Sequence, residues 1–177
     1  MFEIITLAVL SAVGGVLVAA SLGPNTWRIQ RSARINARPE NIYPLINDLR
    51  AFNRWNPFAQ KDPKMQGNYQ GPVEGPGSIY DFRGSGHSGE GSIEIVAHKP
   101  ASEVTMQLNM RKPMKAQNLV VFSLTPAEDA TEVTWLMQGK VPFMGKILHL
   151  LFSMDKMVGR DFESGLANLK TIAEQAP

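Results

Sequence analysis

Apolar and polar residues near the end of the chain alternate with the period of a helix. Apolar side chains recur there at spacings of three and four, and no proline lies between Lys146 and Glu174. The apolar positions are Leu151, Met154, Val158, Phe162, Leu166, Leu169 and Ile172. This spacing is typical of a helix with one buried face. The sequence therefore predicts one long helix over residues 142–174.

The part of the chain before this helix mostly shows a period of two, which is typical of half-buried strands. In the first such segment, Trp27, Ile29, Ala33 and Ile35 alternate with polar residues, and Arg31 interrupts the apolar row. Further strands are expected at residues 78–83, 89–98, 103–111, 117–125 and 131–140. A short edge strand is expected at residues 65–70.

Two short helices are expected between the first strand and this edge strand. Pro39 and Glu40 open the first helix, and the second covers residues 48–53. One face of the predicted sheet is apolar and must be covered, and the C-terminal helix is the only predicted element long enough to cover it. We therefore expect an α+β fold, in which an antiparallel sheet of six to seven strands curves around the C-terminal helix.

Size and composition allow one ordinary folded domain. We expect it to span residues 27–177, after an N-terminal segment and linker at residues 1–26. Lys and Arg number 18 against 16 Asp and Glu, and this small excess includes no dense basic run, so nucleic acid is not an expected partner. The chain has no cysteine, which excludes disulfides, thiolate metal sites and cysteine nucleophiles.

Residues 4–22 carry no charge, and a helix of this length spans about 29 Å, close to the apolar thickness of a bilayer. We expect a single-pass membrane anchor. A signal peptide cleaved before Ser21 and a helix that does not cross the membrane are the alternatives. Four arginines follow between residues 28 and 38, and this positive flank predicts a cytoplasmic domain. Cleavage would instead place the domain in the periplasm or outside the cell.

The candidate motifs for metal and phosphate chemistry are weak. His87, His98 and His149 lie on different predicted elements without ligand spacing, so no metal site is expected. The glycine-rich residues 84–91 lack the Lys-Ser/Thr ending of a phosphate loop and lead into a strand, so a hairpin connection is expected. Ser85 and His87 share this turn without a rigid orienting group, and we assign no catalytic residue to it.

Four segments resemble the START-like superfamily, also called the SRPBCC or polyketide cyclase/dehydrase-related family. They are RSARI (31–35), PENIYPLIND (39–48), WNP (55–57) and MDKMVGRDFESGL (154–166). The resemblance covers about residues 27–174 and implies the helix-grip fold, with a cavity between the inner sheet face and the closing helix. It is more specific for fold than for activity, because such proteins include lipid carriers, quinone and hormone binders and aromatic cyclases.

The residues expected to line this cavity are mainly aromatic side chains and thioethers, which adapt to an apolar guest. They are Trp55, Phe58, Tyr80, Phe82, Met106, Met110, Asn118, Phe122, Trp135, Met137, Phe143, Met154, Met157 and Phe162. The alternative is that they form an ordinary filled core. Among them, Asn118, Tyr80 and the indole N–H of Trp135 are the polar groups expected to orient one end of a guest.

These observations predict a membrane-tethered protein that binds a lipid-, quinone- or polyketide-like hydrophobic molecule, without cofactor or metal. Residues 141–152 are apolar enough to rest on a membrane surface, or they simply begin the closing helix. A cyclase or dehydratase-type enzyme is the first alternative, with the Tyr80 hydroxyl polarising a carbonyl and Asp81, Glu94 or Asp161 accepting a proton. A non-catalytic interaction module with a filled interior is the second. The oligomeric state stays open.

Overall fold

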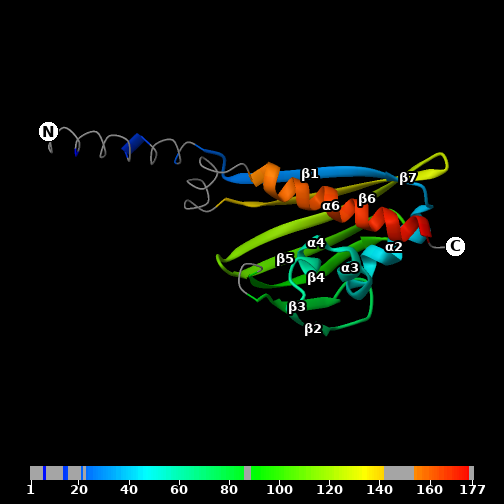
Figure 1. The fold of residues 1–177 in the computed structure, drawn as a ribbon, viewed down its shortest axis with the longest axis horizontal. Coiled ribbons are helices and arrows are strands. Elements are labelled where there is room, and N and C mark those ends of the chain that lie inside the picture. The colour runs from blue at the N-terminus through cyan, green and yellow to red at the C-terminus, as the bar shows by residue number, and fades with distance from the viewer. Residues whose placement is uncertain are drawn as a thin grey trace.

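A computed structural model describes residues 23–85, 89–141 and 154–175, together with residues 6, 14, 15 and 21. Its described part contains a seven-stranded antiparallel sheet in the order β1-β7-β6-β5-β4-β3-β2 (Figure 1). The strands are β1 (Thr26–Ile35), β2 (Gln66–Gln70), β3 (Ile79–Arg83), β4 (Glu90–Lys99), β5 (Glu103–Lys112), β6 (Ala116–Ala127) and β7 (Ala130–Lys140). The helices are α2 (Pro39–Asn47), α3 (Leu49–Trp55), α4 (Pro57–Gln60) and α6 (Met154–Gln175).

All these helices cover one face of the sheet. Figure 1 shows α6 running along β1, while α2, α3 and α4 lie between α6 and the strands of the opposite edge. Residues on the covered face alternate with outward residues along each strand, as the buried positions Val104 and Met106 of β5 and Val133 and Trp135 of β7 show. The predicted helix-grip architecture is confirmed, with strand ends that differ by one or a few residues from those expected.

Local sequence explains how the chain turns between the short helices. Asp48 caps α3, since its Oδ1 accepts from the backbone N–H of Arg50 at 2.7 Å. Asn56 caps the one-turn helix α4 in the same way by accepting from the Phe58 N–H. Pro57 follows this cap, at a position where a helix loses nothing from a missing N–H. This extra turn was not expected from the sequence.

Arg31 explains the break in the apolar row of β1. Its side chain points to the covered face and ends on α6, where the guanidinium contacts Asp155 and Glu163. Gly159 lies between these two residues, and a Cβ there would collide with the guanidinium. The interruption of the pattern therefore marks the position where the helix is fastened to the first strand.

The structure corrects the predicted single-pass membrane localisation. Among the residues that it describes, no helix combines the length and the apolar character needed to cross a bilayer. Most of the 4–22 stretch, on which the prediction was based, lies outside the described residues. Residues 142–153 and 86–88 also lie outside them, so the predicted start of the long helix, the apolar stretch before it and the tip of the glycine-rich hairpin are not described.

Candidate ligand-binding site

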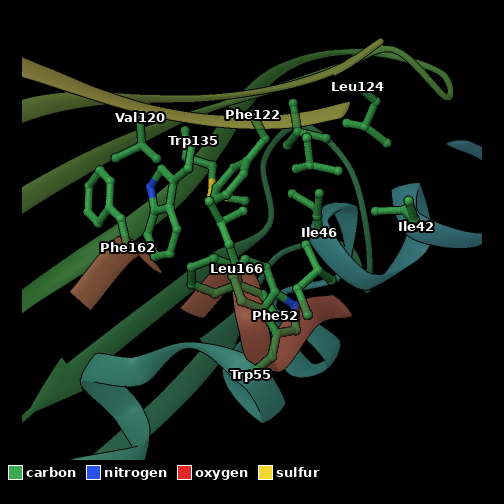
Figure 2. Close-up of a cluster of buried hydrophobic side chains, with 14 of the residues drawn as sticks. Ile42, Ile46, Phe52, Trp55, Val120, Phe122, Leu124, Trp135, Phe162 and Leu166 are labelled. Atoms are coloured by element: carbon green, nitrogen blue, oxygen red, sulfur yellow. The ribbon is translucent and has the colours of Figure 1, made fainter. Parts of the chain in front are cut away.

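An interlocked aromatic cluster fills one part of the interior between the sheet and the helices (Figure 2). The indole of Trp135 stacks on Phe162 of α6, with ring centroids 4.1 Å apart and 6° between the ring planes. Trp55 meets Trp135 and Phe122 edge-on, each at a centroid distance of 5.7 Å, and Phe52 packs edge-on against Trp55 at 4.9 Å. All five rings are at most 3% exposed, so this part of the interior is packed core.

A glycine lets α6 approach this cluster closely. A Cβ at Gly165 would lie 2.7 Å from Cζ3 of Trp135 and 2.8 Å from Cδ of Pro57. Real Cβ atoms do not come so near, and both neighbours belong to rigid rings in a packed core. Gly165 therefore sets how deeply the helix sits against the sheet.

A second group of predicted lining residues lies beyond the cluster, on β3 and β5. Tyr80 is 9% exposed and stacks with Phe82 at a centroid distance of 6.1 Å. A Cβ at Gly91 would lie 2.9 Å from Cζ of Phe82 and 3.2 Å from Sδ of Met110. Phe82 and Met110 thus share the surface above Gly91, and both are only partly buried.

Two polar atoms within the interior have no hydrogen-bond partner in the structure: Oδ1 of Asn118 and Nε1 of Trp135. Asn118 is opposite Gly139 in the sheet, and a Cβ at Gly139 would collide with Oδ1. The indole nitrogen of Trp135 points toward the side of the cluster where Phe162 lies, away from Ile42 (Figure 2). Buried polar atoms are nearly always paired in folded proteins, so an acceptor and a donor left open on adjacent strands indicate a missing partner.

The acid and base groups considered for catalysis are mostly engaged elsewhere. Asp81 accepts two hydrogen bonds from Arg111 on the outer face, at 2.8 and 3.0 Å, and Asp161 forms an ion pair with Lys61. Burial, and secondarily the nearby Tyr69, raise the pKa of Tyr80. The Tyr80 phenol therefore keeps its proton at neutral pH and can donate a hydrogen bond but not act as a base.

No cluster of three or more potential metal ligands occurs within the described residues. His98, the histidine that these residues include, lies 2.6 Å through Nδ1 from the Tyr43 hydroxyl and 3.2 Å from Oδ1 of Asn47. Its contacts join β4 to α2 and explain its presence without a ligand role.

The structure places the predicted lining residues in four situations. The packed core contains Trp55, Met106, Phe122, Trp135 and Phe162. The inner face of β3, β5, β6 and β7 carries Tyr80, Phe82, Met110, Asn118 and Met137. Phe58 and Met157 are 36% and 58% exposed, whereas Phe143 lies outside the described residues and the side chain of Met154 is not described. The exposure of Met157 follows from helical geometry, because five residues at about 100° each place it about 140° around the helix from Phe162.

Sequence reasoning missed the glycines that shape this interior. Gly91, Gly139 and Gly165 each hold a neighbouring side chain where a Cβ would stand. Isolated glycines within strand and helix patterns are the signal for such close approaches. The side chains that approach these glycines can be identified only from the fold, because they lie on other strands or on another element.

Comparisons with known proteins agree with this geometry. Residues 26–174 match the family model described as "Polyketide cyclase / dehydrase and lipid transport". No curated protein matches the chain.

Solved structures share the fold at low sequence identity. Protein CV1439 from Chromobacterium violaceum matches with a TM-score of 0.59 and 14% identity, over 87% of this chain and 100% of its own. The Aha1 dimer from Colwellia psychrerythraea gives a TM-score of 0.57 and 20% identity, over 84% of this chain and 97% of its own. DynU16, a putative protein in the dynemicin biosynthetic locus, gives 0.57 and 14%, over 86% of this chain and 48% of its own.

Proposed function

Because the chain belongs to the family of polyketide cyclases, dehydrases and lipid transport proteins, we propose that it binds a hydrophobic small molecule between the inner sheet face and α6. The guest is lipid-, quinone- or polyketide-like. It lies against Tyr80, Phe82, Met110 and Met137, and the aromatic cluster forms the floor beneath it. Thioether side chains adapt to guests of different shape because they are unbranched and polarisable.

The observation that carries this proposal is the pair of unpaired polar atoms on the inner face. Oδ1 of Asn118 accepts and Nε1 of Trp135 donates, and neither has a partner in the structure. An orphaned buried polar group costs about 1–3 kcal/mol of folding free energy. A hydroxyl group of the guest could donate to Oδ1 or accept from Nε1, while the apolar part of the guest would lie on the aromatic and methionine side chains.

Native mass spectrometry of the full chain purified from cells tests this proposal, together with organic extraction of the purified protein. We expect a bound mass that solvent removes and that re-binds when the extract is returned. Protein that arrives empty and responds to no member of a lipid and quinone panel would overturn the proposal.

A cyclase or dehydratase activity is the second candidate, and the buried Tyr80 hydroxyl favours it. A protonated phenol inside an apolar site can polarise a substrate carbonyl, and burial raises the Tyr80 pKa in the direction that keeps the proton in place. Replacing Tyr80 by Phe should then abolish turnover of a polyketide-like substrate and leave its affinity nearly intact. Equal losses of turnover and affinity would argue against a catalytic hydroxyl.

A further inference from the structure

The sheet carries a second concavity, at the end where its strand pairs separate. The pairing of β6 with β7 ends at Asn118 opposite Gly139. Figure 1 shows the β5–β6 end drawing away from the β1–β7 end beyond this point, toward the left of the view. A pocket of about 1220 Å³ lies there and is lined by the ends of these four strands. We call it the fork pocket.

The lining of the fork pocket is cationic. Among the described residues it contains Arg28, Arg111, Lys115 and Lys140 and neither an Asp nor a Glu. Asp81 of β3 accepts two hydrogen bonds from Arg111. The charges of Arg28, Lys115 and Lys140 are not compensated by any carboxylate of the described lining. A concave surface that carries charges of one sign concentrates ions of the other sign.

Neutral hydrogen-bonding groups accompany these charges. The side-chain amides of Gln107, Asn109, Gln117 and Gln138 belong to the same lining. Oδ1 of Asn109 is buried without a partner in the structure. The fork pocket therefore offers donors and an acceptor between its cations.

The fork pocket lies mainly along the outer face of the sheet, where Arg28, Arg111 and Lys140 are placed, and it reaches residues of the inner face only where the strands separate. Met110 lines the pocket and also lies beside Phe82 above Gly91. Gly139 lines the pocket as well, and it supports the unpaired Oδ1 of Asn118. Trp27 and Val141 add apolar surface from β1 and from the end of β7.

We propose that the fork pocket binds the negatively charged end of the guest, so the ligand is an amphipathic organic anion with a carboxylate or phosphate head. This inference rests on the proposed function, since the apolar part of the same molecule occupies the inner face. Arg28, Lys115 and Lys140 hold the head through charge-assisted contacts, and Met110 and Trp27 contact the first carbons of the chain.

Binding measurements on the full chain with three probes of equal chain length test this proposal. The probes are dodecanoate, dodecyl phosphate and the neutral dodecanol, each titrated calorimetrically at low and at about 0.5 M salt. We expect both anions to bind at least about fivefold more tightly than dodecanol at low salt, and we expect the difference to shrink at high salt because salt screens exposed charges. The tighter anion identifies the head group.

Paired variants on matched positions provide the second measurement. Arg28→Gln with Lys140→Gln removes two pocket cations. Arg34→Gln with Lys99→Gln removes two exposed cations outside the pocket lining, Arg34 being on the same outer face of β1. We expect the first pair to weaken dodecanoate binding about tenfold and leave dodecanol binding unchanged. The second pair should change neither.

The outcomes separate this inference from the function on which it rests. Equal affinity for the anions and for dodecanol, with no effect of the pocket variants, would overturn the anionic head while the hydrophobic guest stands. An equal loss of dodecanoate affinity in both pairs of variants would show that the net charge of the protein, and not the fork pocket, causes the preference for anions. This result would also overturn the anionic head. Binding of none of the three probes would contradict both proposals.

Discussion

Arg31 of β1 donates to both carboxylate oxygens of Asp155 in α6, from Nη1 and Nη2 at 3.1 Å each. Its Nε donates to Oε1 of Glu163 at 2.8 Å. Asp155 and Glu163 lie about two helical turns apart, so one guanidinium fastens the first half of α6 to the edge of the sheet. This half of the helix forms the wall beside the proposed guest.

Replacing Arg31 by Gln should loosen the start of α6 without disturbing the sheet. The planar guanidinium matches a carboxylate in a way that an amide does not. We expect faster hydrogen exchange of the backbone amides in residues 154–163 and unchanged exchange in β5 and β6. Arg34→Gln is the control, because Arg34 points outward from the same strand and its ion pair with Glu128, at 3.6 Å, is exposed. Unchanged exchange in both variants would contradict this role of Arg31.

The effect of Arg31→Gln should depend on pH. Hydrogen bonds from Arg31, reinforced by its charge, hold the pKa of Asp155 below its ordinary value. A carboxyl with a lowered pKa in the folded state stabilises the fold above its unfolded pKa of about 4, and this contribution is lost as the pH falls through the lowered value. The difference in unfolding temperature between wild type and Arg31→Gln should therefore shrink below about pH 4. A difference that stays constant between pH 7 and pH 2 would show that the ion pair is not its source.

The two glycines of α6 whose added Cβ would meet other elements should respond differently to alanine. At Gly165 the new methyl group meets Trp135 and Pro57, and overpacking of this kind costs about 1–3 kcal/mol. At Gly159 it meets only the flexible end of Arg31, and the gain in helix propensity of about 1 kcal/mol offsets the displacement. Because the same gain applies at Gly165, urea unfolding should show a net loss of up to about 2 kcal/mol for Gly165→Ala and little change for Gly159→Ala. Equal values would mean that α6 can shift away from the sheet.

Asn118→Leu should separate stability from binding. Leucine has a similar size and removes the unpaired Oδ1, so the free energy of unfolding of the free protein should rise by about 1 kcal/mol. Affinity for the guest should fall by about two- to tenfold, since one hydrogen bond to it is lost. Asn68→Leu, at an exposed position of β2, controls for the added apolar surface and should leave affinity unchanged. Full affinity in Asn118→Leu would remove Asn118 from the site.

Phe162 and Met157 provide a further test of the wall formed by α6. Phe162 is fully buried and stacked on Trp135, so Phe162→Ala should lower the free energy of unfolding by about 3–5 kcal/mol. Met157 is 58% exposed, and Met157→Ala should change it by less than about 0.5 kcal/mol. Denaturant unfolding of both variants checks the contrast. A large loss for Met157→Ala would indicate that residues near it bury this side chain in solution.

The periodicities of the chain were sufficient to predict the order and type of most elements. Alternation identified the strands because one face of an antiparallel sheet is buried here and the other is not. The one-turn helix α4 was not predicted, since four residues are too few to show a helical period, although Asn56 and Pro57 are suitable residues for its start. Arg31 looked like a defect of the pattern, because its partners lie more than a hundred residues away on α6.

The alternation along the strands also made part of the candidate site predictable. Alternation brought Tyr80, Phe122 and Trp135 to one face, but it could not divide this face into a packed part and a more open part. That division depends on which rings stack and on where a glycine admits a neighbour, as Gly165 does for Trp135. The fork pocket could not be predicted from the sequence, because only strand pairing brings Arg28 and Lys140 to the same end of the sheet.

The order of the strands also constrains when the protein can become complete during its synthesis. Within the sheet, β1 pairs only with β7, with Arg31 opposite Trp135, and its inner face is covered by α6. β1 is thus synthesised long before β7 and α6, the two elements that cover it. Such long-range contacts raise the contact order and slow folding. Until β7 emerges, the nascent chain exposes the edge of β1 that β7 later pairs, and until α6 emerges it exposes the apolar face of β1. Partly folded chains of this kind are prone to aggregate.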